Sequence, residues 1–185
     1  MEELLEIIIP LDLRYRWSAG PHLGAFLRAL KDCRIIANRC PSCGRLQLQP
    51  APICGRCHIH MGEDWVELSH KGTVISFSFV VDAMYDAGIG DMRPVPYTIA
   101  AIVLDGGPDV AFFHRLEEKD PEKVNVGMRV QAVFRPLEER MASIEDIIHF
   151  VLSILHSEKS HKYRESTYYV PEITGILTIQ EPLEY

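Results

Sequence analysis

The sequence predicts a mainly β protein that consists of an N-terminal helix, a four-cysteine zinc ribbon, a small β barrel and a C-terminal extension. Three observations carry this prediction. Apolar residues recur at helical intervals from Pro21 to Asp32, two Cys-x-x-Cys pairs follow within residues 40–57, and a period-two alternation begins at Gly72. A chain of 185 residues with 47% hydrophobic content can bury a core of its own. The predicted parts are 1–33 for the N-terminal segment and helix, 34–70 for the ribbon, 71–155 for the barrel and 156–185 for the extension.

The first predicted element is an amphipathic helix from Pro21 to Asp32. Proline is favoured in the first turn of a helix. The apolar side chains of this stretch share one face, which we expect to pack on the chain's own core: Leu23, Phe26, Leu27 and Leu30. The preceding cluster, Arg14 to Ser18, contains Arg, Tyr and Trp, which are residue types that anchor interfaces. A plain surface role for this cluster is an equal alternative.

Four cysteines form the strongest chemical signal in the chain. Two Cys-x-x-Cys pairs separated by about ten residues are the ligand pattern of a structural zinc ribbon. Four thiolates complete a closed tetrahedral shell that holds structure and does not activate water. Two disulfides, four unrelated core cysteines and a rubredoxin-like iron site are the alternatives. The predicted metal ligands are Cys40, Cys43, Cys54 and Cys57.

Turn-forming residues surround both cysteine pairs. Pro41 and Gly44 flank the first turn and Gly55 lies inside the second, where unusual φ values are expected. Residues 45–53 predict a short hairpin arm that ends in the second turn. Three further residues are expected outside the metal shell: Cys33 as a buried spare thiol, and His58 and His60 on the surface.

The second half of the chain predicts a small closed or partly closed β barrel. Period-two alternation predicts a strand from Gly72 to Val81. The connection from Ala83 to Pro96 is rich in Gly, Asp and Pro, which is typical of a binding loop or a mobile loop. Further strands, separated by turn residues, are expected at Tyr97–Leu104, Val110–Leu116 and Arg129–Phe134.

The segment from Ser143 to Leu155 is ambiguous. A barrel still needs its last strand here, whereas the periodicity predicts a helix because the apolar residues recur at helical intervals: Ile144, Ile147, Ile148, Val151, Leu152 and Leu155. The tail that follows begins charged and becomes apolar from Ile173. We expect it to pack on the barrel or on a partner.

The sequence contains no recognisable catalytic constellation. His114 lies at an alternating position of a strand and is expected to be a structural histidine. Asp105 is most simply a turn residue, and Asp82 has no partner that would assign it a role.

The charge of the chain limits the classes of partner. A net charge of -7 and a pI near 5.6 argue against broad binding to a phosphate backbone. The acidic N-terminus and its short apolar run predict neither a signal peptide nor a membrane helix, so we expect a cytoplasmic protein with reduced cysteines. Four ribbon arginines keep a nucleic-acid-binding module as an alternative: Arg34, Arg39, Arg45 and Arg56.

An ordered set of motifs covers roughly residues 20 to 152. Its members are Arg39–Gly44, Cys54–Cys57, Trp65–Leu68, Gly72–Val74, Pro96–Asp105 and Val126–Val130. The set resembles the acyl-CoA-associated OB-fold proteins with an N-terminal rubredoxin-like zinc ribbon, domain-of-unknown-function family thirty-five. The resemblance implies a five-stranded OB-fold barrel after a rubredoxin-like ribbon. It also implies that the ambiguous segment is the final strand, against the periodicity, and that the tail of about thirty residues departs from the family.

The resemblance further implies a non-catalytic accessory subunit of a thiolase-type enzyme, although some family members accompany hydratases or aldolases. The partner would supply the nucleophilic cysteine and the histidine bases for making or breaking a carbon-carbon bond. This chain would dock on the partner and shape or shield the channel for the CoA thioester. The stretch from Tyr15 to Gly20 looks like the opening of thiolase-associated members.

The implied cofactors are structural zinc and a coenzyme A thioester, the latter as substrate of the complex. The implied partner is a thiolase-superfamily subunit in a hetero-oligomer, with acyl-CoA at the shared interface and with neither nucleic acid nor membrane. The alternative function is a zinc-ribbon and OB-fold module that binds nucleic acid or proteins in general. A stand-alone thioesterase-like enzyme ranks lowest because the residues it needs are not visible.

Overall fold

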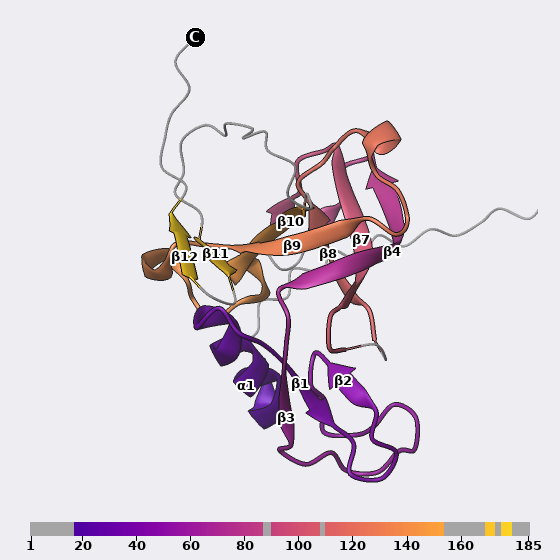
Figure 1. The fold of residues 1–185 in the computed structure, drawn as a ribbon, viewed down its shortest axis with the longest axis vertical. Helices are drawn as coiled ribbons and strands as arrows, with labels where there is room; N and C mark the ends of the chain where they lie inside the picture. The colour runs from indigo at the N-terminus through magenta and orange to yellow at the C-terminus, as the bar shows by residue number, and fades with distance from the viewer. Residues whose placement is uncertain (1–16, 87–89, 108–109, 154–168, 173–174, 179–185) are drawn as a thin grey trace, which may run out of the picture.

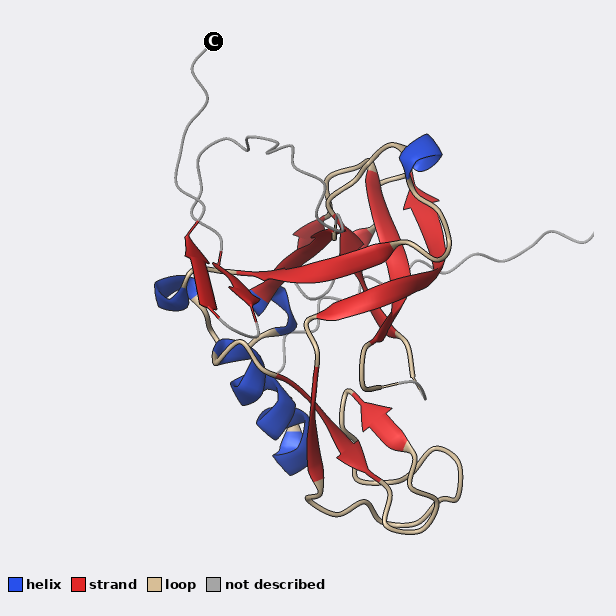
Figure 2. Ribbon diagram, viewed as in Figure 1, coloured by secondary structure: helices blue, strands red, loops and turns tan. Residues whose placement is uncertain are grey.

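The computed structural model describes residues 17–86, 90–107, 110–153, 169–172 and 175–178, the last two ranges as backbone alone. The start of the Arg14–Ser18 cluster and most of the predicted extension 156–185 lie outside the described residues. Strands dominate the described part of the chain, and its one α-helix precedes them (Figure 2). The predicted class, mainly β with an N-terminal helix, is therefore confirmed.

Helix α1 spans Gly20–Lys31. Pro21 lies in its first turn, where a missing backbone N–H costs no hydrogen bond. The predicted apolar face is the buried one, because Phe26 and Leu30 are fully buried and Leu23 and Leu27 pack against the same core.

Three short strands form the ribbon sheet: β1 (Ile35–Arg39), β2 (Leu46–Leu48) and β3 (Trp65–Leu68). Strand β1 is central and pairs antiparallel with both neighbours. The predicted hairpin arm forms β2, which returns along β1 and leads to the second cysteine pair. Figure 1 shows this sheet extending from one end of the barrel with α1 alongside.

Five strands close the barrel: β4 (Lys71–Val80), β7 (Tyr97–Leu104), β8 (Phe112–Leu116), β9 (Arg129–Phe134) and β10 (Ile147–Leu152). Pairing runs β4–β7–β8–β10–β9 and returns from β9 to β4. Only the β8–β10 contact in this ring is parallel. This connectivity is that of a five-stranded OB-fold barrel, as predicted.

The ambiguous segment is a strand. Ser143 caps a short 3-10 helix, η3 (Ile144–Asp146), and β10 follows it. Ile147 and Phe150 are both buried although they are three residues apart, because the register of β10 against β9 shifts between Ile147 and His149. A β-bulge of this kind reverses the alternation of faces. The bulge therefore places two buried residues three apart within a strand, a spacing that periodicity alone assigns to a helix.

One hydrophobic core joins the helix, the ribbon sheet and the barrel. The rings of Phe26 in α1 and Phe112 in β8 meet edge to face with centroids 6.3 Å apart. Ile35 in β1 and Phe150 in β10 belong to the same buried cluster. The ribbon sheet is therefore fixed to the barrel through shared packing.

Several short elements complete the described structure. The predicted Ala83–Pro96 loop contains a hairpin of two-residue strands, β5 (Tyr85–Asp86) and β6 (Asp91–Met92). In the tail, β11 (Tyr169–Glu172) pairs with β9 and with β12 (Gly175–Thr178), so this part of the tail adds to the barrel sheet. The remaining 3-10 turns are η1 (Pro121–Lys123) and η2 (Leu137–Glu139). None of the described helices is long and apolar enough to cross a membrane.

Candidate metal centre

The first cysteine turn follows directly after β1. The backbone N–H of Cys40 donates to the carbonyl of Arg45 at 2.9 Å, and the N–H of Gly44 donates back to the carbonyl of Cys40 at 3.0 Å. These bonds close a tight turn with Cys40 and Cys43 on its inner side. Gly44 has a φ of 71°, a left-handed conformation that only glycine adopts without strain.

The second turn repeats this geometry. The N–H of Cys54 donates to the carbonyl of Ile59 at 2.9 Å, and the N–H of His58 donates to the carbonyl of Cys54 at 3.0 Å. The left-handed residue here is His58, with a φ of 58°, whereas Gly55 has no positive φ. The expectation that Gly55 supplies the unusual φ is therefore wrong, because the strained position is the fourth residue after the first cysteine in both turns.

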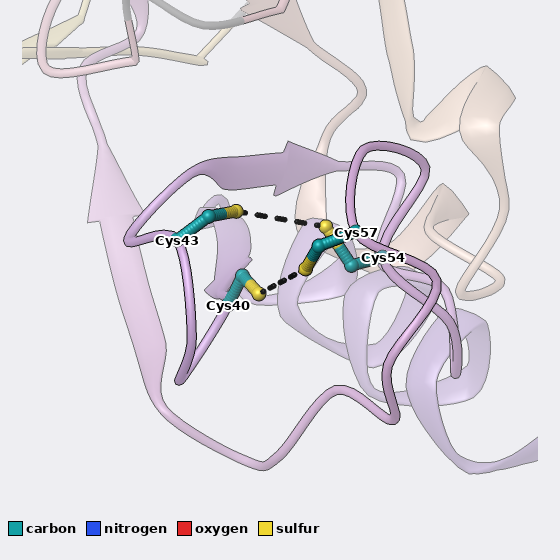
Figure 3. Close-up of side chains that lie close together, drawn as sticks. All are labelled: Cys40, Cys43, Cys54 and Cys57. Atoms are coloured by element: carbon teal, nitrogen blue, oxygen red, sulfur yellow. Dashed lines mark hydrogen bonds between the residues drawn. The ribbon is translucent and has the colours of Figure 1, made fainter.

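The two turns bring four thiols together. Their sulfur atoms all lie within 4.8 Å of one another. Figure 3 shows the side chains converging from the two turns, with Cys40 Sγ 3.5 Å from Cys57 Sγ and Cys43 Sγ 3.8 Å from Cys54 Sγ. A tetrahedral shell with Zn–S bonds of about 2.3 Å separates its sulfurs by about 3.8 Å. The cluster therefore fits a metal such as zinc.

The cysteines are free thiols in the structure, so the disulfide alternative does not describe it. Backbone N–H groups of Cys57 and Arg56 lower the pKa of Cys54 to about 6, and the N–H of Cys43 is the first cause of a lowered pKa at Cys40. Burial raises the pKa of Cys57 to about 11. The turns thus stabilise thiolates at the first cysteine of each pair, and thiolate is the form that binds metal.

The cluster is enclosed by the protein. Cys40 and Cys54 are buried and pack with Met61, while Cys43 and Cys57 are partly buried. Four protein sulfurs satisfy a tetrahedral ion and leave no position for a substrate or water. His58 and His60 are exposed, as predicted, and His60 pairs by its backbone with Ile53. A donor set of this kind holds the fold together and does not activate water.

Among the residues that the structure describes, the others that the sequence singled out do not gather into a second site. Cys33 is buried, and this burial raises the pKa of its thiol to about 11, which makes it unreactive. Asp105 lies in the turn after β7, where Arg129 of β9 pairs with it, and Asp82 is exposed. His114 is buried inside the barrel against the rings of Phe112 and Phe150.

The sequence predicts a satisfied structural histidine at this position, whereas the buried His114 is not fully satisfied. Its Nδ1 atom has no hydrogen-bond partner among the described residues. Desolvation is the first cause that lowers the pKa of His114 to about 4, and the charge of Arg115 acts in the same direction. The imidazole is therefore neutral at physiological pH.

The structure also contains an ion network that sequence reasoning missed. Glu145, just before β10, accepts from Arg115 Nη2 at 2.7 Å and from Arg93 Nη2 at 3.1 Å. Arg93 Nε also donates to Asp86 Oδ2 at 2.7 Å. The network ties the β4–β7 connection to the β9–β10 connection. Its members are up to 59 residues apart (Asp86 to Glu145), so no local pattern marks them.

The mildly basic ribbon is partly neutralised. Arg34 Nε lies 2.7 Å from Glu67 Oε2, and Arg39 Nε lies 3.5 Å from Asp64 Oδ2. These two arginines therefore offer less net charge to a phosphate backbone than the sequence suggests.

Comparisons with known proteins place the fold in a family. The family model described as the C-terminal OB-fold domain of ChsH2 matches residues 65–135. A DUF35 domain-containing scaffold protein of Methanocaldococcus jannaschii is 33% identical over 105 residues, which cover 57% of this chain and 70% of the relative. A second DUF35 domain-containing scaffold protein, from Pyrococcus furiosus, is 31% identical over 106 residues, or 57% of this chain and 72% of the relative.

A solved structure shares the fold. The structure described as "Ltp2-ChsH2(DUF35) aldolase" superposes with a TM-score of 0.53 at 24% sequence identity, and covers 74% of this chain and 98% of that chain. From the sequence relatives, the matched barrel and the four-cysteine turns together, the chain belongs to the DUF35 family.

Proposed function

We propose that this chain is a non-catalytic accessory subunit that docks on a thiolase-type enzyme and shapes or shields the channel for its CoA thioester substrate. The observation that carries the proposal is the relationship to family members described as scaffold proteins. The closed donor set of the cysteine cluster supports it, because such a site stabilises a docking element and cannot activate a nucleophile. We infer a cytoplasmic location, where cysteines remain reduced.

Zinc is the metal that we propose for the cluster, with Cys40, Cys43, Cys54 and Cys57 as its ligands. When bound, the ion would link the two turns of the ribbon through coordinate bonds to the four sulfurs. Short zinc-binding segments gain on the order of 10 kcal/mol of folding free energy from the metal. Iron has the same ligand preference and is distinguished by metal analysis and by the visible absorption of an iron–thiolate site.

The contribution to catalysis would be positional. A subunit that excludes water and orders a long acyl-CoA at a shared interface lowers the barrier without supplying a reacting group. The described residues support this division of labour, since the buried His114 has a lowered pKa and packs against phenylalanines instead of a nucleophile.

The experiment is purification of the tagged chain from its native organism, followed by identification of the bound subunit. Turnover of acyl-CoA is then measured for the chain alone, the partner alone and the complex. We expect no turnover by the chain alone and faster turnover by the complex than by the partner alone. Turnover by the chain alone at the rate of the complex would exclude an accessory role.

An aldolase-type partner is the second candidate, because the solved structure that shares the fold is described as an Ltp2-ChsH2 aldolase. The same preparation decides between the two. A thiolase-type partner gives free-CoA-dependent cleavage of a 3-oxoacyl thioester, whereas an aldolase gives cleavage that needs no free CoA.

A further inference from the structure

Five exposed apolar side chains belong to two elements that the ion network joins, the connection between β4 and β7 and strand β8. Val81, Met84, Tyr85 and Met92 belong to the connection that contains β5 and β6, and Phe113 belongs to β8. We name these five residues the hairpin surface. Exposed apolar side chains that gather in one region mark interaction sites, and Met and Tyr are enriched where interfaces form.

Two members of the hairpin surface are paired in a strand ladder, and a third lies on a barrel strand. Tyr85 and Met92 are direct cross-strand partners in the β5–β6 ladder. Phe113 points outward from β8, because its neighbours Phe112 and His114 are buried. Arg115 shares the outward face with Phe113 at a distance of about 7 Å along the strand.

The ion network fixes the hairpin to that face. Arg93, which follows β6, is bonded on one side to Asp86 of β5 and on the other to Glu145. Glu145 also accepts from Arg115, so it bridges the hairpin to β8. The Arg93 side chain is only 14% exposed, which shields these ion pairs from water. The apolar side chains are therefore held outward before any partner arrives, which lowers the entropy cost of binding.

Acidic side chains beside the hairpin surface limit the charge that a partner surface can carry there. Asp82 and Asp91 are exposed, and among the described residues neither carboxylate forms an ion pair, although Asp91 Oδ1 accepts from the backbone N–H of Met92 at 2.7 Å. Their carboxylates border Met84 and Met92 along the chain, in a protein with a net charge of -7. A partner that covers the hairpin surface therefore needs an apolar centre and Lys or Arg at its edge. Acidic side chains at that edge would face the carboxylates of Asp82 and Asp91, and such like-charge contacts across an interface are costly.

We propose that the hairpin surface is the contact through which this chain docks into an apolar groove, rimmed by basic residues, on its enzyme partner. The inference rests on the proposed accessory function and adds the place of contact and the chemistry of the partner's surface. A second copy of this chain and the chain's own N-terminal residues are the other occupants that the experiment separates.

The test is methionine footprinting with dilute hydrogen peroxide on the free chain and on the natively purified complex. Met84 and Met92 are 66% and 49% exposed, and Met141, at 79% in a different connection, is the matched internal control. In the free chain all three should oxidise at similar rates. In the complex we expect at least fivefold slower oxidation of Met84 and Met92, with Met141 unchanged.

The outcomes separate this inference from the proposed function. If no enzyme subunit co-purifies, the accessory function itself fails, and this inference fails with it. If a complex forms but Met84 and Met92 oxidise as in the free chain, the accessory function stands and the hairpin surface is not the contact. Protection in the free chain would also overturn the proposal, pointing to a second copy if it depends on concentration and to the chain's own N-terminal residues if it does not.

Variants give an independent measurement with the identified partner. Tyr85→Ala should weaken binding at least tenfold, whereas Leu137→Ala, at an equally exposed apolar position elsewhere, should leave it within twofold. Neutralising both carboxylates, as Asp82→Asn with Asp91→Asn, should slow association and reduce its salt dependence. Equal affinities for Tyr85→Ala and Leu137→Ala would overturn the proposal.

Discussion

Replacement of His114 by leucine should remove a defined part of the acid sensitivity of the fold. Burial is the main cause that lowers the pKa of His114 from 6.5 to about 4. The unfolded chain therefore binds a proton at this residue below pH 6.5 while the folded chain does not. The resulting contribution to stability is complete above pH 6.5 and is lost as the pH falls toward 4. A shift of this size corresponds to about 3 kcal/mol at 1.36 kcal/mol per pKa unit.

The assay is urea unfolding of wild type and His114→Leu at several pH values between 7.5 and 4, followed by far-UV circular dichroism. The difference in unfolding free energy between the two proteins is the readout. Other titrating groups, including His149 and the cysteine cluster, are present in both proteins and cancel in this difference. Leucine suits the apolar surroundings formed by Phe112 and Phe150. We expect the difference to shift by about 3 kcal/mol in favour of the variant between pH 7.5 and 4.

The control is Phe113→Leu, which changes an exposed apolar residue of the same strand, removes no titrating group and should leave the pH profile parallel to that of wild type. Parallel profiles for His114→Leu and wild type would refute the reasoning, because they would mean that His114 takes up its proton equally in the folded and unfolded states.

Three further predictions concern the ribbon and the barrel. Cys57→Ser, or removal of metal by a chelator, should abolish amide protection in β1 and β2, since the metal contributes on the order of 10 kcal/mol in such segments; hydrogen exchange that remains slow after chelation would contradict this. Gly72→Ala should destabilise the protein by about 1–3 kcal/mol in urea unfolding, because its new Cβ would lie 2.7 Å from the carbonyl oxygen of Val103; Gly24→Ala, whose nearest new contact is a flexible arginine side chain, is the control. Gly44→Ala should cost about 1 kcal/mol and His58→Gly should gain a similar amount, measured as opposite shifts in melting temperature, since both positions have a left-handed φ.

Elements were predicted best from the sequence where a local pattern of residues is compatible with only one structure. The turn residues that separate Tyr97–Leu104 and Arg129–Phe134 from their neighbours predicted β7 and β9 at their observed bounds. The four cysteines were found by spacing alone, because paired turns must place two thiols on the same side. The helix was similarly clear, with a proline at its start and one apolar face.

The features that the sequence did not predict depend mostly on how distant segments of the chain meet in the fold. Period analysis of residues 143–155 favoured a helix, since it cannot detect the register shift that puts Ile147 and Phe150 on the same face. Two-residue strands such as β5 and β6 are too short to carry any period. Glu145 meets Arg93 and Arg115 only after the barrel closes, and the left-handed φ of His58 comes from its turn and not from its residue type.

The connection between ribbon and barrel has a consequence for the strength of assembly. The Arg140 side chain, in the loop before β10, donates to the carbonyl of Lys31 at the end of α1 at 3.1 Å, beside the core that Phe26 and Phe112 share. Such a joint leaves the ribbon sheet and the barrel little freedom to reorient independently. Any protein that binds both the ribbon sheet and the barrel meets the second of them at a high effective concentration, so two weak contacts combine into avidity far above either affinity. Loosening the joint should reduce that gain while each separate contact keeps its own affinity.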